Sequence, residues 1–314
     1  MNRFLLACAI FAIIAGSASE TAAQPEPGAP EVLIDSTGAF FMNPVWSPSG
    51  ERLVVTGPGY GGIWLLNRNG DGLRQITDAP SAGFGMTWSP GGEALLTRVA
   101  RYEDRRRRDA VAVFDVAEGE RELLTDYRSQ MPTLPQWSPS GQRVVLPGAG
   151  DAPEVLQTER TAAPSSQSDV LYASGSSIRA AQPETGSART VASRESGRVL
   201  NVTPSPDGSK IAYEVMGGPL VVMDADGANR VEIGRGGDPS WSPDGEWVAF
   251  VRTEDDGHRI TASELHAARA DGSARAQLTD TPDRLEMRPA WSPGGDTIAF
   301  DDHEGTVWLL PVSD

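Results

Sequence analysis

The sequence predicts an all-β protein, a six-bladed β-propeller with four strands in each blade. A turn of the type Trp-Ser-Pro-Asp-Gly, followed by an apolar run, occurs six times, starting at Trp46, Trp88, Trp137, Pro204, Trp241 and Trp291. The intervals are 42, 49, 67, 37 and 50 residues, and a repeat of roughly 40 to 50 residues is typical of a propeller blade. The last unit lacks a fourth strand, which a strand near the amino terminus can supply.

The repeated turn has a clear physical basis in residues 241–250 (WSPDGEWVAF). Proline sets φ for a turn position, aspartate hydrogen-bonds its own backbone, and glycine adopts positive φ. The tryptophan before the turn supplies a large apolar ring. The five motif tryptophans are therefore expected to pack between blades.

Residues 1–23 are predicted to be a signal peptide. Arg3 precedes an apolar run over residues 4–15, and small residues at 16–18 and 21–23 suit cleavage. The run is shorter than the roughly 20 residues of a membrane span, so no stable membrane insertion is expected after cleavage. Anchoring by an uncleaved segment is the alternative. Residues 24–30 (QPEPGAP) form a Pro-rich linker, and residues 31–36 form a strand.

The first unit illustrates the expected order of strands. Its strands are predicted at residues 39–46, 53–56, 63–67 and 73–77. The turn between the third and fourth strands contains Asn-Gly and Asp-Gly, which favour a hairpin because Gly and Asn tolerate positive φ. Similar turns follow at residues 116, 182, 224 and 269.

The third unit departs from this pattern because it is too long. Residues 149–169 are rich in Ala, Ser, Pro and Gln and are predicted to be an inserted loop. Residues 170–173 (VLYA) are either an additional strand or the second strand of the unit.

The sixth unit is short. It contains apolar strands at residues 297–300 and 306–310 and has no fourth strand before residue 314. Pairing of residues 31–36 with this unit would close the ring and remove an open sheet edge. Residues 31–314 are therefore expected to form one propeller domain.

The composition narrows the class of protein. A formal charge of −16 disfavours binding to nucleic acid. The only cysteine, Cys8, lies in the predicted signal peptide, so the mature chain has no disulfide. The expected protein is a monomer held together by its core and by ring closure.

Loop lengths indicate which face carries function. The turns at one face are short and uniform. Loops at the other, here called the top face, vary in length, and residues 98–109 and 253–259 form two of the long ones. Variation on one face of a fixed scaffold is typical of a binding surface.

The six motifs, with their apolar strands and acidic hairpins such as MDADG, resemble the TolB-like β-propeller family. The resemblance covers residues 31–314 and implies the fold. It also implies a periplasmic location and a central funnel that receives a peptide of a partner protein. The family's full-length translocation protein has an additional α/β domain before its propeller, which this chain lacks.

Residues ahead of each motif are expected to line the mouth of the central channel: Asn43, Gly85, Leu134, Val202, Asp238 and Arg288, with Phe84, Asn201 and Glu286 close by. Their mixed character suits a bound peptide, and equally a water-filled channel without a ligand.

The basic run Arg105, Arg106, Arg107 and Arg108 lies in a long top loop. It is interpreted either as a solvated loop tip or as a contact to an acidic partner. His258 and His303 belong to neighbouring units, and His266 is interpreted as structural. No catalytic constellation, metal site or cofactor is predicted.

The sequence therefore predicts an exported, non-catalytic scaffold that binds an envelope protein or peptide at its top face, with a role in envelope integrity or transport. The alternative is a carbohydrate-active enzyme or glycan-binding protein that uses the central channel. A sensor subunit held at the membrane by an uncleaved signal segment is a third hypothesis.

Overall fold

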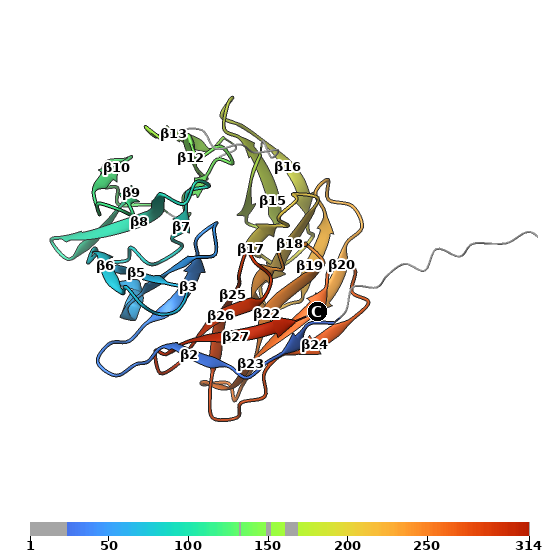
Figure 1. Cartoon of the computed structure of the whole chain (residues 1–314). Helices are drawn as coiled ribbons and strands as arrows, with labels where there is room; N and C mark the ends of the chain where they lie inside the picture. Colours follow the sequence, from blue (N-terminus) through green and yellow to red (C-terminus); the bar gives the residue numbers. More distant parts are fainter. Residues whose placement is uncertain (1–23, 132, 149–151, 161–168, 314) are drawn as a thin grey trace, which may run out of the picture.

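The protein is an all-β propeller with seven blades. The computed structural model describes residues 24–131, 133–148, 152–160 and 169–313. These residues form seven antiparallel sheets arranged around a ring, with β3, β17 and β25 toward its middle (Figure 1). The prediction of six blades is therefore wrong. Among the described residues, no helix is long and apolar enough to cross a membrane.

Four blades have four consecutive strands each. The strands of blade 1 are β3 (Met42–Trp46), β4 (Arg52–Thr56), β5 (Ile63–Asn67) and β6 (Arg74–Thr77), with a short 3-10 helix η1 (Pro58–Tyr60) between β4 and β5. Those of blade 2 are β7 (Thr87–Trp88), β8 (Ala94–Glu103), β9 (Arg106–Asp115) and β10 (Arg121–Leu123). Those of blade 5 are β17 (Val199–Pro204), β18 (Lys210–Val215), β19 (Leu220–Asp224) and β20 (Val231–Gly234). Those of blade 6 are β21 (Gly237–Trp241), β22 (Trp247–Asp255), β23 (Ile260–Arg269) and β24 (Arg275–Gln277).

The error in the blade count lies in the long third unit, which contains two three-stranded sheets. Blade 3 consists of β11 (Gln136–Trp137), β12 (Arg143–Leu146) and β13 (Glu154–Gln157), and blade 4 of β14 (Val170–Ser174), β15 (Ser177–Gln182) and β16 (Ser187–Ser193). Strand β13 lies inside the predicted insert, whose residues 149–151 and 161–168 are outside the described residues. In blade 4 a two-residue turn joins the paired residues Ser174 and Ser177. This turn has no Trp or Pro, so counting the motif missed the blade.

The six repeated turns fold as their chemistry predicts. The motif serine is buried in each: Ser47, Ser89, Ser138, Ser205, Ser242 and Ser292. In blade 6, for example, Ser242 Oγ accepts a hydrogen bond from the backbone N–H of Trp247 at 2.9 Å. The fifth residue of the turn, Gly245, has a φ of 72°, which glycine adopts without the strain that a Cβ would introduce.

The motif tryptophans join neighbouring blades, as predicted. Four indole N–H groups donate to a backbone carbonyl of the preceding motif-bearing blade in the ring: Trp46 to Ala290, Trp88 to Val45, Trp137 to Thr87 and Trp241 to Thr203, at 2.9, 3.2, 3.4 and 3.0 Å. Trp291 differs, because its indole donates to Gly295 of its own turn and its backbone N–H donates to Ser240 Oγ of blade 6. Apolar clusters fill the space between blades, as where Val54 of blade 1 and Leu95 of blade 2 share one cluster.

Replacing Trp241 with Phe should lower the free energy of unfolding by about 1–3 kcal/mol, because the bond to the Thr203 carbonyl is lost at a blade interface. Trp64→Phe is the matched control. The Trp64 indole N–H has no hydrogen-bond partner among the described residues, so a loss below about 1 kcal/mol is expected. Urea denaturation measures both. Equal losses would show that the indole hydrogen bond does not hold the blades together.

Blade 7 is built from both ends of the chain. Its strands β25 (Glu286–Trp291), β26 (Thr297–Asp302) and β27 (Val307–Ser313) are joined by β2 (Glu31–Ile34), which pairs antiparallel with β27. This confirms that the amino-terminal strand completes the last blade. The short strand β1 (Glu26–Pro27), inside the predicted linker, pairs with the same edge.

Candidate functional site

The inner strands share an unusual backbone position near the top face. Asn43, Asn201, Asp238 and Arg288 each lie three residues before the first motif residue and have φ values of 57°, 46°, 54° and 51°. Each coincides with a shift in strand register. Residues other than glycine rarely adopt this left-handed conformation, and irregularities of this kind redirect side chains, often beside functional sites.

In blades 5 and 6, Asn201 and Asp238 bind the same carboxylate, that of Glu214. The Asn201 amide donates to Glu214 Oε1 at 2.8 Å, and the backbone N–H of Asp238 donates to the same oxygen at 2.5 Å. Glu214 lies on β18, directly beside the inner strand β17. One carboxylate thus connects the left-handed residues of two neighbouring blades.

The other contacts join blades 7, 1 and 2. The Arg288 guanidinium forms an ion pair with Asp301 on β26, and Arg288 Nε donates to Asp301 Oδ1 at 2.9 Å. The same oxygen accepts the backbone N–H of Asn43 at 3.1 Å. The Asn43 amide donates to the carbonyl of Gly83, ahead of blade 2, at 3.1 Å.

We call Asn43, Asn201, Glu214, Asp238, Arg288 and Asp301 the channel cluster. It holds three carboxylates and one guanidinium, and that guanidinium is committed to the fully buried Asp301. Asp238 is the most open of the three carboxylate residues: it is exposed, whereas Glu214 is half-buried. The accessible part of the cluster therefore carries negative charge without a paired cation.

Desolvation raises the pKa of all three carboxyl groups, including that of Asp238, whose side chain is accessible to solvent but closely surrounded by protein atoms at the channel mouth. Loss of hydration raises the pKa of Glu214, although the hydrogen bonds from Asn201 and from the Asp238 N–H oppose this effect. Loss of hydration also raises the pKa of Asp238, and here the positive charge of Arg288 opposes it. Burial raises the pKa of Asp301 to about 6 despite its pair with Arg288. For Arg288, burial acts to lower the pKa, but the bond to and charge of Asp301 prevail and raise it. A bound cation would offset the desolvation of these carboxylates.

The sequence analysis missed Glu214 and Asp301. A signal for them exists, because each is the tenth residue after the first residue of its motif, Pro204 or Trp291, at the end of an apolar run on the second strand. In blade 2 this position is Arg98, whose Nη1 donates to the Met131 carbonyl at 2.6 Å. The tenth position is thus charged in blades 2, 5 and 7.

Phe84 borders the channel cluster, next to Gly83, and is 40% exposed. Its ring meets Tyr60 edge to face with centroids 5.0 Å apart, and the Arg98 guanidinium lies 5.7 Å from its centroid. Gly85 packs against Leu134, where a Cβ would come within 2.4 Å of the leucine side chain. The side chains of Tyr60, Phe84 and Leu134 therefore form an apolar part of the channel mouth on the side of blades 2 and 3.

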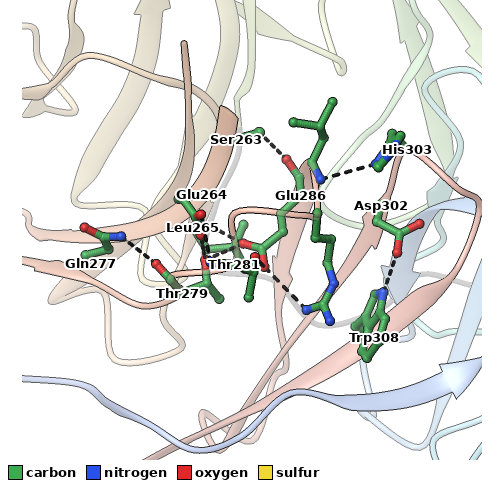
Figure 2. A network of polar contacts seen from close by, with 12 residues as sticks. Ser263, Glu264, Leu265, Gln277, Thr279, Thr281, Glu286, Asp302, His303 and Trp308 are labelled. Atoms are coloured by element: carbon green, nitrogen blue, oxygen red, sulfur yellow. Dashed lines mark hydrogen bonds and ion pairs between the residues drawn. The ribbon is translucent and has the colours of Figure 1, made fainter. Parts of the chain in front are cut away.

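Glu286 belongs to a separate, buried network between blades 6 and 7 (Figure 2). Its carboxylate accepts bonds from Thr279 Oγ1, from Thr281 Oγ1 at 2.8 Å and from the Leu265 N–H at 3.2 Å. Thr279 Oγ1 also lies 2.8 Å from Glu264 Oε2, so the two carboxylates share its single hydroxyl proton. Burial, and the nearby charge of Glu264, raise the pKa of Glu286. Glu286 is fully buried, so it stabilises the blade contact rather than lining an open surface.

The same network leads to a hollow of about 450 Å³ beside His303 and Trp308. Figure 2 shows Trp308 donating to Asp302. His303 Nδ1 accepts a hydrogen bond from the Leu285 N–H at 3.3 Å. Arg284 covers the Trp308 ring at 3.7 Å. Among the described residues, no group of three or more His, Cys, Asp and Glu side chains is arranged to hold a metal ion.

The basic run forms the tip of the long β8–β9 hairpin. Arg105 lies in the turn with a φ of 62°, and Arg106, Arg107 and Arg108 begin β9. Arg107 pairs with Asp109 at 2.9 Å, and Arg108 pairs with Glu103 at 2.8 Å. Arg105 and Arg106 are exposed and form no ion pair within the part of the chain that the structure describes. The structure places no bond between this tip and the channel cluster.

No family model and no curated protein matches the chain. Among 1198 matching chains of solved structures is TolB from Acinetobacter baumannii, at 14% identity and a TM-score of 0.51, covering 88% of this chain. The chain spans 64% of the length of that TolB chain. A chain from the crystal structure of the mitotic checkpoint complex has a TM-score of 0.63 at 14% identity over 100% of both chains. Oligogalacturonate lyase from Vibrio parahaemolyticus has a TM-score of 0.52 at 12% identity, over 93% of this chain and 97% of that one. At such identities, the likenesses show the β-propeller fold alone.

Proposed function

We propose that this protein is an exported, non-catalytic scaffold whose channel mouth binds a protein partner through a peptide segment that carries a cationic group. The observation that carries the proposal is the channel cluster, which joins residues of four blades and exposes the carboxylate of Asp238. A lysine or arginine side chain of a partner would supply the missing counter-charge.

The geometry also suits an extended segment rather than a flat surface. The mouth combines exposed amide and carboxylate groups on blades 5 and 6 with the aromatic pair Tyr60 and Phe84 on the blade 1 and 2 side. A few placed polar groups beside apolar surface are typical of ligand sites. One matched propeller belongs to a protein complex and another is TolB, and both likenesses are consistent with a binding role. The proposed place in the periplasm and in envelope integrity or transport rests on the TolB-like repeats of the sequence.

The test is a pull-down from an envelope extract with a bait that begins at Gln24. The key variant is Asp238→Asn, which removes the charge but keeps a residue that tolerates positive φ. The control replaces Arg105, Arg106, Arg107 and Arg108 with Ser. Because these residues are mostly exposed and their ion pairs partly so, the control should unfold within about 1 kcal/mol of the parent.

We expect the parent and the four-Ser control to enrich the same envelope protein, and Asp238→Asn to lose at least about tenfold in affinity for it, as for a lost charge-assisted bond. Binding should also weaken as the pH is lowered and the carboxylates take up protons. Loss of binding in the control alone would move the interface to the β8–β9 hairpin. Enrichment of nothing by any bait would contradict the scaffold function.

A second candidate is binding or cleavage of acidic polysaccharide, because one matched propeller is an oligogalacturonate lyase. The negative charge of the channel cluster opposes a polyuronate at this mouth. Shortening of oligogalacturonate by the parent, followed by chromatography, would support this function in place of the scaffold.

A further inference from the structure

A cavity of about 280 Å³ lies between blades 5 and 6 and shares no lining residue with the channel cluster. Its lining residues come from four segments: Gly234 and Arg235 at the end of β20, Phe250 and Arg252 on β22, His266 on β23 and Arg275 on β24. The Phe250 ring is 3% exposed and forms an apolar floor, on which His266 stacks at a centroid distance of 5.8 Å. A cavity of this size suits a small ligand.

Three arginines line this cavity, and none of them has a carboxylate partner among the described residues. Arg235 and Arg252 form no ion pair or side-chain hydrogen bond among the described residues, and Arg275 donates only to the backbone carbonyl of Glu232, at 3.3 Å. Most ion pairs of this acidic protein use other arginines, as in the pairs of Arg68, Arg128 and Arg269. The lining of the cavity therefore holds three cationic side chains and no carboxylate.

The carboxylates of Glu254 and Glu264 lie close to the cavity but do not line it. Glu264 is the cross-strand partner of Arg252, but its two oxygens accept bonds from Thr279 at 2.8 Å and from the Thr281 N–H at 2.9 Å (Figure 2). Glu254 lies with Arg252 along an adjoining hollow. Burial, with the charge of Arg252, lowers the pKa of His266 even though Glu264 opposes the shift. The lining itself therefore offers arginine and histidine side chains to a ligand and no carboxylate.

The geometry points to a binding site for a small tetrahedral oxyanion, such as a phosphate or sulfate group, held by Arg235, Arg252 and Arg275. Planar guanidinium groups donate paired hydrogen bonds that match the oxygens of such a group. The Phe250 floor leaves room for a small apolar substituent on the anion. His266 lies with Arg235, Arg252 and Arg275 around this cavity and with Glu254 and Glu264 around the adjoining one. A bound anion would therefore favour the protonated, positively charged form of His266.

Isothermal titration calorimetry with inorganic phosphate at low ionic strength tests this site, with the chain that begins at Gln24. We expect one saturable site, similar binding of sulfate, and weaker binding of acetate, which is planar and carries one charge. Arg252→Gln and Arg275→Gln should each weaken phosphate binding about tenfold or more. Filling the site should also raise the pKa of His266, followed by NMR of its ring.

Arg105→Gln/Arg106→Gln is the matched control, because it removes exposed, unpaired arginines elsewhere on the protein. It should bind phosphate within about twofold of the parent, since charges that do not contact the anion act on it only weakly through the high dielectric of water. If this control loses as much affinity for phosphate as Arg252→Gln and Arg275→Gln do, the loss reflects the net charge of the protein and the proposal is overturned. Absence of saturable binding by the parent, or acetate binding equal to that of phosphate, would overturn it as well.

Discussion

A chain that begins at Ser36 should lose about 5 kcal/mol of unfolding free energy relative to one that begins at Gln24. The deletion removes β1 and β2, which place five residues in register with β27. Backbone hydrogen bonds contribute about 1 kcal/mol each, and the half-buried side chains of Leu33 and Ile34 leave the cluster that joins blades 7 and 1. Thermal and urea denaturation measure the loss.

The deletion also leaves the edge of β27 unpaired, so the shortened chain should associate at high concentration. A synthetic peptide of residues 24–36 should restore the lost stability, because it can add to the free edge as a strand. A peptide of the same composition in scrambled order is the control. Unchanged stability of the shortened chain would show that the ring does not depend on this closure.

Replacing Arg288 with Met should lower the free energy of unfolding by about 3–5 kcal/mol at pH 8, because it leaves the fully buried Asp301 without its cation. At pH 5 the loss should shrink to about 1–2 kcal/mol, which corresponds to the lost hydrogen bonds alone. Urea denaturation at the two pH values measures the difference.

The sign follows from the pKa of Asp301, which burial raises to about 6 from an ordinary 3.8. The folded protein therefore binds this proton more tightly than the unfolded chain does, and the contribution of Asp301 to stability falls as the pH rises from about 4 through about 6. Without Arg288 the pKa rises further, so the carboxyl is neutral at pH 5 and no charge is stranded. The surface pair of Arg68 and Asp296 is the control: Arg68→Gln should cost at most about 1 kcal/mol. An equal loss at both pH values for Arg288→Met would contradict the buried ion pair.

The local chemistry of the turns made much of the fold predictable. Serine, proline and glycine act within five residues, so Gly245 and its five equivalents adopt the expected positive φ. The amino-terminal strand was also predictable, because blade 7 has only three strands of its own. Blade 4 was not, since a two-residue turn between Ser174 and Ser177 joins its first two described strands and lacks the repeated motif. Counting the repeated turns therefore gave six blades, because the sheet of blade 4 forms without this turn.

The candidate site was partly predictable. Asn43, Asn201, Asp238 and Arg288 were placed at the mouth by their spacing from the motif, and the structure brings all four into the channel cluster. Their partners Glu214 and Asp301 were not found, because they lie on second strands and meet the cluster only through pairing with β17 and β25. Such contacts depend on register between strands, which a motif spacing does not reveal.

The pairing of β2 with β27 also has a kinetic consequence. Each blade is built mainly from strands adjacent in the sequence, so its contacts are local and can form early. The contact between Glu31 and Leu309 joins segments separated by nearly all the other strands, and a contact with so long an intervening loop forms slowly. Blade 7 is therefore the last to be completed, and the rate of that single step governs how long a nearly folded chain exposes a free edge to its neighbours.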